Sequence, residues 1–441
     1  MVKRLSSRLI RWFCLGAIAL LLSLLPLVAR SETPNLSDSI LNMEGGLEAT
    51  FERHFATDLA TVDQDPAAIA QTLERLAIET GTRSAVFWVI PRDTHLHLVL
   101  ITPSGEPIVH DLFDVPRERL TPVVRAFYRD LIRRPIDRQR AATQLYQWLI
   151  APMRESIEAA NIDTLLFCFG DGLRGLPAAA LFDGEQFLVE RYSSAAIPAF
   201  NLIDTRYQKI AAGQVLAMGA SEFTTLPPLP AVPVELEAIA SELQTALQPE
   251  APWRGQTMLN EAFTLPNLRA QLAEHDYAIV HLATHAEFRP GTPENSYIQF
   301  WDERLSLDQM RSLDWRDPPL ELLVLSACRT AIGDEEAELG FAGVALQAGV
   351  KSALASRWYV SDSGTLALMS EFYRQLPLAP TKAEALRRAQ VQLLRGAVRF
   401  EGDRLQLSRG SVALPDNLSR SSETLNRPFF WAGFVLISSP W

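Results

Sequence analysis

Short apolar runs and longer stretches of helical periodicity take turns along most of the chain. The apolar runs are rich in β-branched and aromatic residues, as is typical of strands buried on both faces, and they lie at 84–90, 95–101, 164–169, 214–218, 277–284, 321–326, 352–358 and 429–437. Apolar residues three and four positions apart predict helices at 117–134, 138–160, 234–247, 339–348, 364–376 and 382–396. Buried strands separated by helices predict an α/β fold, in which helices flank a mostly parallel sheet.

Local signals refine this organisation. Thr381 and Glu384 form a capping box that predicts the start of the last helix. Four prolines between 226 and 233 are too many for a helix or strand interior, so we expect an exposed, extended linker there. The polar stretch 401–427 is predicted to be a long surface loop. The predicted parts are a leader (1–31), a helical extension (32–79), a first half (80–225), the linker (226–233) and a second half (234–441).

The leader differs from everything that follows it. Four basic residues, Lys3, Arg4, Arg8 and Arg11, precede an apolar run of about 17 residues at 12–28. A basic start followed by a run this short favours a cleaved signal peptide over a retained membrane anchor, which is the alternative. The sequence therefore predicts export to a periplasmic or extracellular compartment. No later run reaches 18 uninterrupted apolar residues, so we expect no membrane contact beyond the leader.

Charge and cysteine content narrow the function classes. The chain has 441 residues and a formal net charge of −11, without the long Lys/Arg stripe expected of a nucleic-acid-binding protein. Nucleic acid is therefore not an expected ligand. Outside the leader the only cysteines are Cys168 and Cys328, which could form one disulfide after export. Because Cys168 lies in an apolar run, we favour its interpretation as a small buried hydrophobe.

Two reactive side chains stand at the ends of predicted strands. His285 ends the apolar run that begins at 277, and Cys328 follows the run at 321–326. Carboxyl ends of neighbouring parallel strands meet at one crevice, so we expect the imidazole and the thiol to lie within reach of each other. An imidazole that accepts the thiol proton generates a nucleophilic thiolate. The amides of Cys328 and of the loop after His285 could then stabilise an oxyanion.

Four segments around these residues resemble the CHAT domain, a caspase-like and separase-like group within the caspase-haemoglobinase fold. In chain order they are VHLATHAEF (280–288), LVLSACRTA (323–331), ELGFAGVALQAGVKSALASRWYVSD (338–362) and RPFFWAGFVLIS (427–438). The resemblance extends over residues 80–441 because LLFCFGDGLRGLPAAALFDGEQFLVERY (165–192) is similar to the stretch before the family's catalytic half. It implies that 80–225 and 234–441 are the non-catalytic and catalytic halves of one CHAT domain.

The resemblance also implies roles for individual residues. His285 matches the family's catalytic histidine and Cys328 its nucleophile, while Trp358 and Asp362 match a Trp-x-x-x-Asp element beside the substrate groove. In separases an aspartate of that element is implicated in holding a basic P1 side chain. Asp362 is equally well placed to be a helix N-cap.

Two positions depart from the family pattern. Ala286 stands where the family has a glycine whose amide helps to form the oxyanion hole, and the Cβ of an alanine penalises a positive φ. Arg329 stands where Glu or Asn is common, and its positive charge would either favour a thiolate or crowd the substrate groove.

Other polar residues have simpler interpretations. His281 and His285 are four apart, but β-branched neighbours favour a strand over the helix that a zinc protease motif requires, so we expect no metal and no cofactor. His281 is interpreted as a hydrogen-bonded core residue. The acidic run at 334–338 is interpreted as a solvated loop after the nucleophile.

The sequence leaves three functions open. The first is a cysteine endopeptidase that cleaves a partner protein through the Cys328–His285 dyad. The second is a catalytically silent CHAT scaffold, and the third is a hydrolase of a small amide substrate that uses the same dyad. About 45 residues separate the leader from the domain, too few for a helical-repeat solenoid, so any regulatory protein is expected to be a separate chain.

Overall fold

In the computed structural model the described residues are 35–59, 62–103, 105–133, 139–210, 214–245, 254–313, 315, 320–415, 418 and 424–441. The predicted leader lies outside them. Residues 40–441 group into one unit. Thirteen strands of the described chain form its main sheet: β1 (Ser84–Pro91), β2 (Leu96–Ile101), β3 (Ile108–Leu112), β4 (Thr164–Phe169), β5 (Ser193–Ala196), β6 (Gln214–Gly219), β7 (Arg254–Leu259), β8 (Tyr277–Phe288), β9 (Tyr297–Gln299), β10 (Arg304–Ser306), β11 (Leu322–Thr330), β12 (Ser352–Ser356) and β16 (Phe434–Ser438).

The sheet is mixed and mostly parallel. Its main path runs β10-β9-β8-β11-β12-β16-β5-β4-β1-β2-β3, and β6 pairs with β7 and β8. Pairing is parallel in β6–β7, β6–β8, β8–β11, β11–β12, β16–β5, β5–β4 and β4–β1. Antiparallel pairs lie toward both ends of this path and where β16 meets β12. The predicted α/β class is therefore confirmed.

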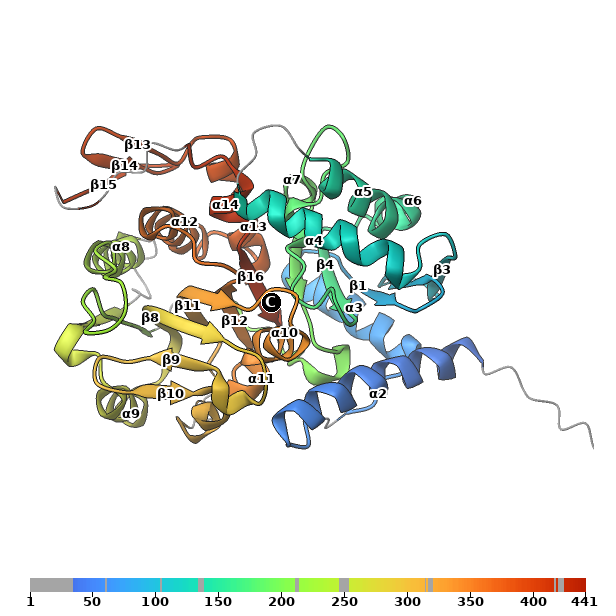
Figure 1. Ribbon diagram of the computed structural model, residues 1–441, viewed down its shortest axis with the longest axis horizontal. Coiled ribbons are helices and arrows are strands. Elements are labelled where there is room, and N and C mark those ends of the chain that lie inside the picture. Colours follow the sequence, from blue (N-terminus) through green and yellow to red (C-terminus); the bar gives the residue numbers. More distant parts are fainter. Residues whose placement is uncertain are drawn as a thin grey trace, which may run out of the picture. The chain divides into compact units, whose positions relative to one another are not determined.

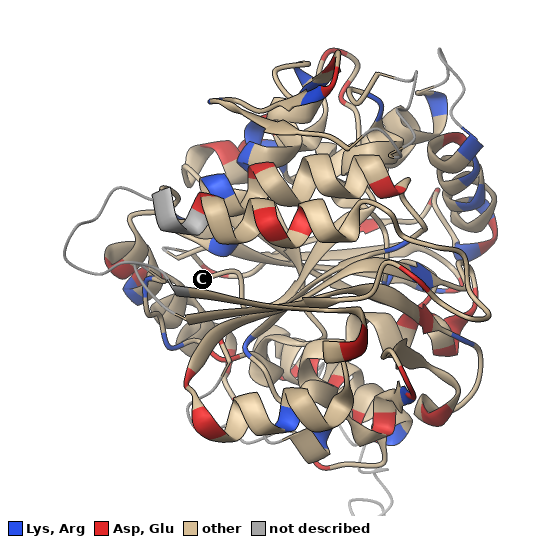
Figure 2. Cartoon of the chain, turned by 90° about the vertical axis from the view of Figure 1, so that its left-hand side faces the viewer, with Lys and Arg blue, Asp and Glu red and all other residues tan. Residues whose placement is uncertain are grey.

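Helices lie above and below the sheet, and most charged residues are on these outer helices and loops while the strands between them are largely uncharged (Figure 2). Within one layer, α8, α12 and α13 pack side by side (Figure 1). The helices are α2 (Leu36–Phe55), α3 (Pro66–Thr80), α4 (Arg117–Arg133), α5 (Arg140–Leu149), α6 (Arg154–Ala159), α7 (Leu188–Arg191), α8 (Val232–Thr245), α9 (Leu265–Glu274), α10 (Glu335–Ala342), α11 (Val344–Ala348), α12 (Asp362–Gln375), α13 (Lys382–Leu394) and α14 (Pro428–Trp431). No helix of the described residues combines the length and the hydropathy needed to cross a bilayer.

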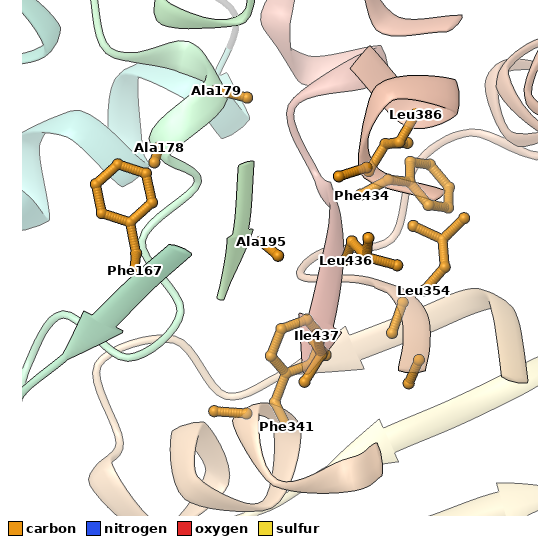
Figure 3. Packing of buried hydrophobic residues seen from close by; sticks show 14 of the residues in the cluster. Phe167, Ala178, Ala179, Ala195, Phe341, Leu354, Leu386, Phe434, Leu436 and Ile437 are labelled. Atoms are coloured by element: carbon orange, nitrogen blue, oxygen red, sulfur yellow. The ribbon is translucent and has the colours of Figure 1, made fainter. Parts of the chain in front are cut away.

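The last strand of the chain lies in the middle of the sheet. β16 pairs antiparallel with β12 on one side and parallel with β5 on the other, where Ile437 faces Ala196. Figure 3 shows this junction, where Leu436 and Ile437 lie between Leu354 of β12 and Ala195 of β5. Buried residues from Ile40 to Trp441 belong to one hydrophobic core.

Several local predictions are confirmed, and others are wrong for identifiable reasons. The Thr381 hydroxyl accepts a hydrogen bond from the Glu384 amide at 3.2 Å, as the capping box predicted. The stretch predicted as a surface loop contains a small antiparallel sheet of β13 (Arg399–Glu401), β14 (Arg404–Gln406) and β15 (Ser411–Ala413). Leu405 is buried between two polar neighbours, so β14 is a half-buried strand. With three residues it is too short for the alternation of apolar and polar positions to be recognised in the sequence.

The Pro-rich segment at 226–233 also differs from the expected exposed linker. Leu229 and Ala231 are buried, and α8 begins at Val232, inside the segment. Because proline is tolerated in the first turn of a helix, Pro233 does not delay that start. The segment thus packs against the sheet close to β8.

Candidate active-site cleft

The strands that end in the predicted histidine and cysteine are neighbours. β8 and β11 pair in parallel, and their pairing begins with Leu322 opposite Ile279 and continues to Leu325 opposite Leu282. Between Leu325 and Ala327 the register shifts by one residue. After the shift, Ala327 is opposite His285, and Cys328 is opposite Ala286. Because paired residues of parallel strands share a face, His285 shares a face with Ala327, and Cys328 shares the opposite face with Ala286.

A cleft of about 860 Å³ opens at the carboxyl ends of these two strands. His285, Ala327 and Arg329 line it, together with Trp358 and Tyr359 from the segment after β12. Cys328 is not among the lining residues. The predicted crevice therefore exists, but the histidine and the thiol do not both open into it.

The His285 ring is held in a defined position at the cleft wall. Its Nε2 lies 2.8 Å from the Pro227 carbonyl oxygen. Since a carbonyl oxygen only accepts hydrogen bonds, Nε2 carries the proton that it donates, and Nδ1 of the neutral ring carries the lone pair. Phe223 packs against the ring at a centroid distance of 4.8 Å, and Tyr359 stacks on it at 6.3 Å. The imidazole is thus oriented as a base whose acceptor nitrogen is Nδ1.

The Cys328 side chain is fully buried. Its thiol donates a hydrogen bond to the Leu325 carbonyl oxygen at 3.3 Å. Burial penalises the thiolate and raises the pKa of Cys328 to about 12. In this arrangement the thiol is protonated at neutral pH and is a poor nucleophile.

The two residues whose amides were predicted to form the oxyanion hole, Cys328 and Ala286, both lie within strands. The Cys328 N–H donates to Ser356 Oγ at 3.0 Å, and the Ser356 hydroxyl donates to the Cys328 carbonyl oxygen at 3.1 Å. This reciprocal pair joins the end of β11 to the end of β12 and occupies the Cys328 amide. Ala286 is buried within β8, in extended backbone rather than at positive φ.

Trp358, Arg329 and Tyr359 also line the cleft. Trp358 is largely buried, and its indole N–H donates to the Phe429 carbonyl oxygen at 3.0 Å. A Cβ on Gly433 would lie 2.9 Å from this indole, so a glycine there allows the ring to pack. Arg329 and Tyr359 are exposed to the cleft. Sequence reasoning had no basis for selecting Tyr359, because a single aromatic residue in a loop carries no periodic signal.

Asp362 lies at the start of α12 rather than in the cleft lining. Ser361 is the N-cap of this helix, and one carboxylate oxygen of Asp362 accepts a hydrogen bond from the Ala231 amide at 2.5 Å. Burial, opposed by that hydrogen bond, raises the pKa of Asp362 to about 7. The carboxylate thus fixes the chain just before α8, and its predicted contact with substrate remains a prediction.

His281 is buried in the layer behind the cleft. Its Nδ1 lies 3.1 Å from the Tyr373 hydroxyl, and its Nε2 lies 3.0 Å from Glu235 Oε1. Both contacts come from helices that cover the sheet. The residue is a partnered core histidine, as the sequence indicated.

A buried arginine next to the cleft was not predicted. Arg357 is fully buried, with its guanidinium 3.3 Å from Glu338 and 3.2 Å from the Tyr128 hydroxyl. A Cβ on Gly175 would lie 1.8 Å from the Arg357 Cζ, so only glycine fits there. Glu338 belongs to the acidic run that was interpreted as a solvated loop; that interpretation is wrong, because Asp334 caps α10, the helix begins at Glu335, and Glu338 is buried in it.

The sequence profile of the CHAT domain matches residues 139–439, which include the whole cleft except one outer side chain, Ile132. The chain belongs to the CHAT domain family. A search of curated protein sequences finds no match. The family assignment made from the four segments is thereby confirmed.

The CHAT domain is also similar to solved structures. One is the separase of Saccharomyces cerevisiae in complex with securin, with a TM-score of 0.44, 10% identity, and coverage of 85% of this chain and 31% of the separase chain. Another is the complex of the pro- and mature domains of Porphyromonas gingivalis RgpB, with a TM-score of 0.43, 10% identity, and coverage of 81% and 78%. The chain therefore spans about a third of the length of that separase chain.

Proposed function

We propose that this CHAT domain is a cysteine endopeptidase that cleaves a partner protein, with Cys328 as nucleophile and His285 as general base, in a resting arrangement that shields the thiol. The observation that carries the proposal is the contact between His285 Nε2 and the Pro227 carbonyl oxygen. This contact leaves the lone pair on Nδ1, in a ring that forms the wall of an open cleft. A base oriented in this way suits proton transfer from a nucleophile.

The proposed reaction needs few further groups. Nδ1 of His285 takes the proton of Cys328, and the thiolate attacks the scissile carbonyl carbon. The amides of Cys328 and Ala286 stabilise the oxyanion, and the leaving amine receives the proton from His285. Water then hydrolyses the thioester, and His285 again accepts and returns the proton.

Activation requires the thiol to change faces. Leu322–Leu325 pair with Ile279–Leu282, and extension of this register without a shift would set Cys328 opposite His285. A one-residue slip in pairing moves side chains from one face of a strand to the other. We therefore propose that the register shift between Leu325 and Ala327 moves to a point beyond Cys328. This movement would convert the resting arrangement into the active one. The same movement would release the Cys328 amide from Ser356.

The cleft suits an extended peptide better than a compact small molecule. It is an open depression whose walls combine apolar and aromatic side chains with the charged side chains of Glu287, Arg289 and Arg329. Tyr359, which stacks on the His285 ring, and Phe429 offer apolar contact area in the cleft. A protein substrate whose binding stabilises the active register would couple recognition to activation.

A peptidyl acyloxymethyl ketone probe tests the proposal, because it alkylates a thiol only beside a working base. The full chain is incubated with the probe and candidate partner proteins, and the labelled residue is identified by mass spectrometry. Labelling of Cys328 should disappear in Cys328→Ala and in His285→Ala but persist in Cys168→Ala, the matched control. If the probe labels Cys168 alone, or labels His285→Ala as strongly as wild type, the peptidase assignment fails.

The buried thiol favours a second candidate, a CHAT domain that binds a protein partner without cleaving it. The full burial of Cys328 and its occupied amide are the observations behind this candidate. A binding protein should capture the same partner with equal affinity in wild type and Cys328→Ala, with no cleavage product from either. A product that appears only with wild type would decide for the peptidase.

We also propose that the protein is exported, on the basis of the basic and apolar leader. Fractionation of the source cells followed by N-terminal sequencing tests this proposal. In the exported fraction, the N-terminal residue of the chain is expected to be Ser31 or Glu32, or a residue close to them. A chain with an intact leader in the cytoplasmic fraction would contradict it.

A further inference from the structure

Three side chains that commonly bind metals meet on the β2–β3 hairpin, apart from the cleft. His95 and His97 flank Leu96 at the start of β2, so both imidazoles project to the same side of the strand. Asp111 of β3 is paired directly with His97. The hairpin lies at the β3 end of the sheet path, and five strands separate β2 from β11.

The ligand atoms of these residues converge on one point. Asp111 Oδ1 lies 3.4 Å from His95 Nε2 and 2.6 Å from His97 Nδ1. All three atoms lie within 4.8 Å of one another, and they are the only such group of His, Cys, Asp or Glu in the described part of the chain. A tetrahedral ion with bonds of about 2.0–2.1 Å holds its ligand atoms about 3.4 Å apart, so small side-chain rotations would admit one.

The surroundings orient one ligand and shield the cluster. Thr94 Oγ1 lies 2.9 Å from His95 Nδ1, so the Thr94 hydroxyl oxygen can accept a hydrogen bond from Nδ1–H and leave the Nε2 lone pair available to an ion bound between Nε2 and Asp111. The Phe113 ring packs over His95 at a centroid distance of 5.1 Å. The two histidine side chains are only 21% and 23% exposed, which limits their rotational freedom before an ion binds.

We propose that His95, His97 and Asp111 bind one divalent transition-metal ion of the zinc class, with the remaining coordination position filled by water. Two imidazoles and one carboxylate are a ligand set that suits zinc and its neighbours better than calcium or magnesium, which prefer oxygen ligands. The bound ion would clamp β2 to β3. This inference is independent of the proposed peptidase activity, because no residue of the cluster lines the cleft.

Calorimetric titration of the metal-stripped, tag-free full chain with ZnCl₂ tests the site. Wild type should bind one equivalent, and its thermal unfolding temperature should rise with zinc. His97→Gln and Asp111→Asn should each weaken binding by about tenfold or more, and Thr94→Val should weaken it by about tenfold through loss of the partner of His95. Co²⁺ in place of Zn²⁺ should give the visible absorption bands of a tetrahedral site.

His110→Gln is the matched control. His110 is exposed and adjacent to Asp111, but it pairs with Leu98 and so projects from the other face of the hairpin. Its substitution should change zinc affinity less than about twofold. Equal zinc binding by wild type and His97→Gln, or equal losses in His110→Gln and His97→Gln, would overturn the proposal. In the first of these cases Asp111 would be only a hydrogen-bond partner of the two histidines.

Discussion

Ala327 is paired directly with His285 where β8 and β11 end at the cleft. The side chain beside the oriented imidazole is therefore a methyl group, and the thiol that follows it in sequence lies on the other face of the sheet. A single shift in register between Leu325 and Ala327 produces this difference. The chemistry of the cleft thus depends on strand pairing as much as on residue identity.

Burial of Cys328 predicts slow alkylation of the resting protein. With a pKa near 12, its thiolate fraction at pH 8 is about 1,000-fold below that of an ordinary thiol. Iodoacetamide should therefore leave Cys328 unmodified under native conditions and modify it rapidly in guanidinium chloride, as followed by mass spectrometry. Rapid native modification without any partner would show that the thiol is already accessible.

The Ser356 hydroxyl should hold the resting arrangement in place. In Ser356→Ala the buried Cys328 amide and carbonyl lose their partner, which should lower the free energy of unfolding by about 1–3 kcal/mol and speed alkylation of Cys328. Ser352→Ala is the control, because Ser352 lies at the other end of β12 and donates to the Ser439 carbonyl oxygen. Ser352→Ala should lower the free energy of unfolding measured in urea, but the rate of Cys328 alkylation should stay that of wild type.

Gly175→Ala should be strongly destabilising. The added Cβ would overlap the buried Arg357 guanidinium and separate it from Glu338, which should cost about 3 kcal/mol or more. Gly45→Ala provides a contrast, since a Cβ at this position on α2 would have no neighbouring atom within 4 Å. Urea unfolding should show a stabilisation of about 0.5–1 kcal/mol for Gly45→Ala. Similar values for the two variants would contradict this account of Gly175.

Asp362 should make stability decrease as pH rises from about 4 to 7. Its pKa of about 7 in the folded protein exceeds the ordinary 3.8, so in this range the folded state binds a proton that the unfolded state has released. Asp362→Asn keeps an oxygen for the Ala231 amide and removes the titration. The free energy of unfolding of Asp362→Asn, relative to that of wild type, should therefore rise by up to about 4 kcal/mol as the pH increases to 8. Urea unfolding at pH 4.5, 6 and 8 measures this; a constant difference would rule out the raised pKa.

Arg329 should select acidic substrate side chains if the proposed peptidase is correct. It is the exposed cation that follows the nucleophile, whereas Asp362 lies outside the cleft lining. A cleavage-site profile of the wild-type protein should be enriched in Asp or Glu near the cut, and Arg329→Gln should lose this enrichment with at least a tenfold fall in kcat/KM for acidic sites. Enrichment in Arg or Lys would instead support the predicted role of Asp362.

The sequence by itself determined the strands and helices whose signals are local. The apolar run at 164–169 is β4, and the Thr381–Glu384 capping box starts α13, because burial on both faces and helix capping depend on adjacent residues. The run at 429–437 was less informative, because its first part forms the short helix α14 and only its end forms β16. The four motif segments also determined the family.

Only the tertiary structure decided which side chains meet. The register shift that sets Ala327 beside His285 leaves no trace in hydrophobic periodicity, since both registers bury the same run of residues. The contact of His285 with Pro227 joins residues 58 positions apart, and the Arg357–Glu338 pair depends on the space left by Gly175. Composition and order along the chain determined which reactive groups the protein has. Long-range packing decided their faces, their burial and hence their protonation.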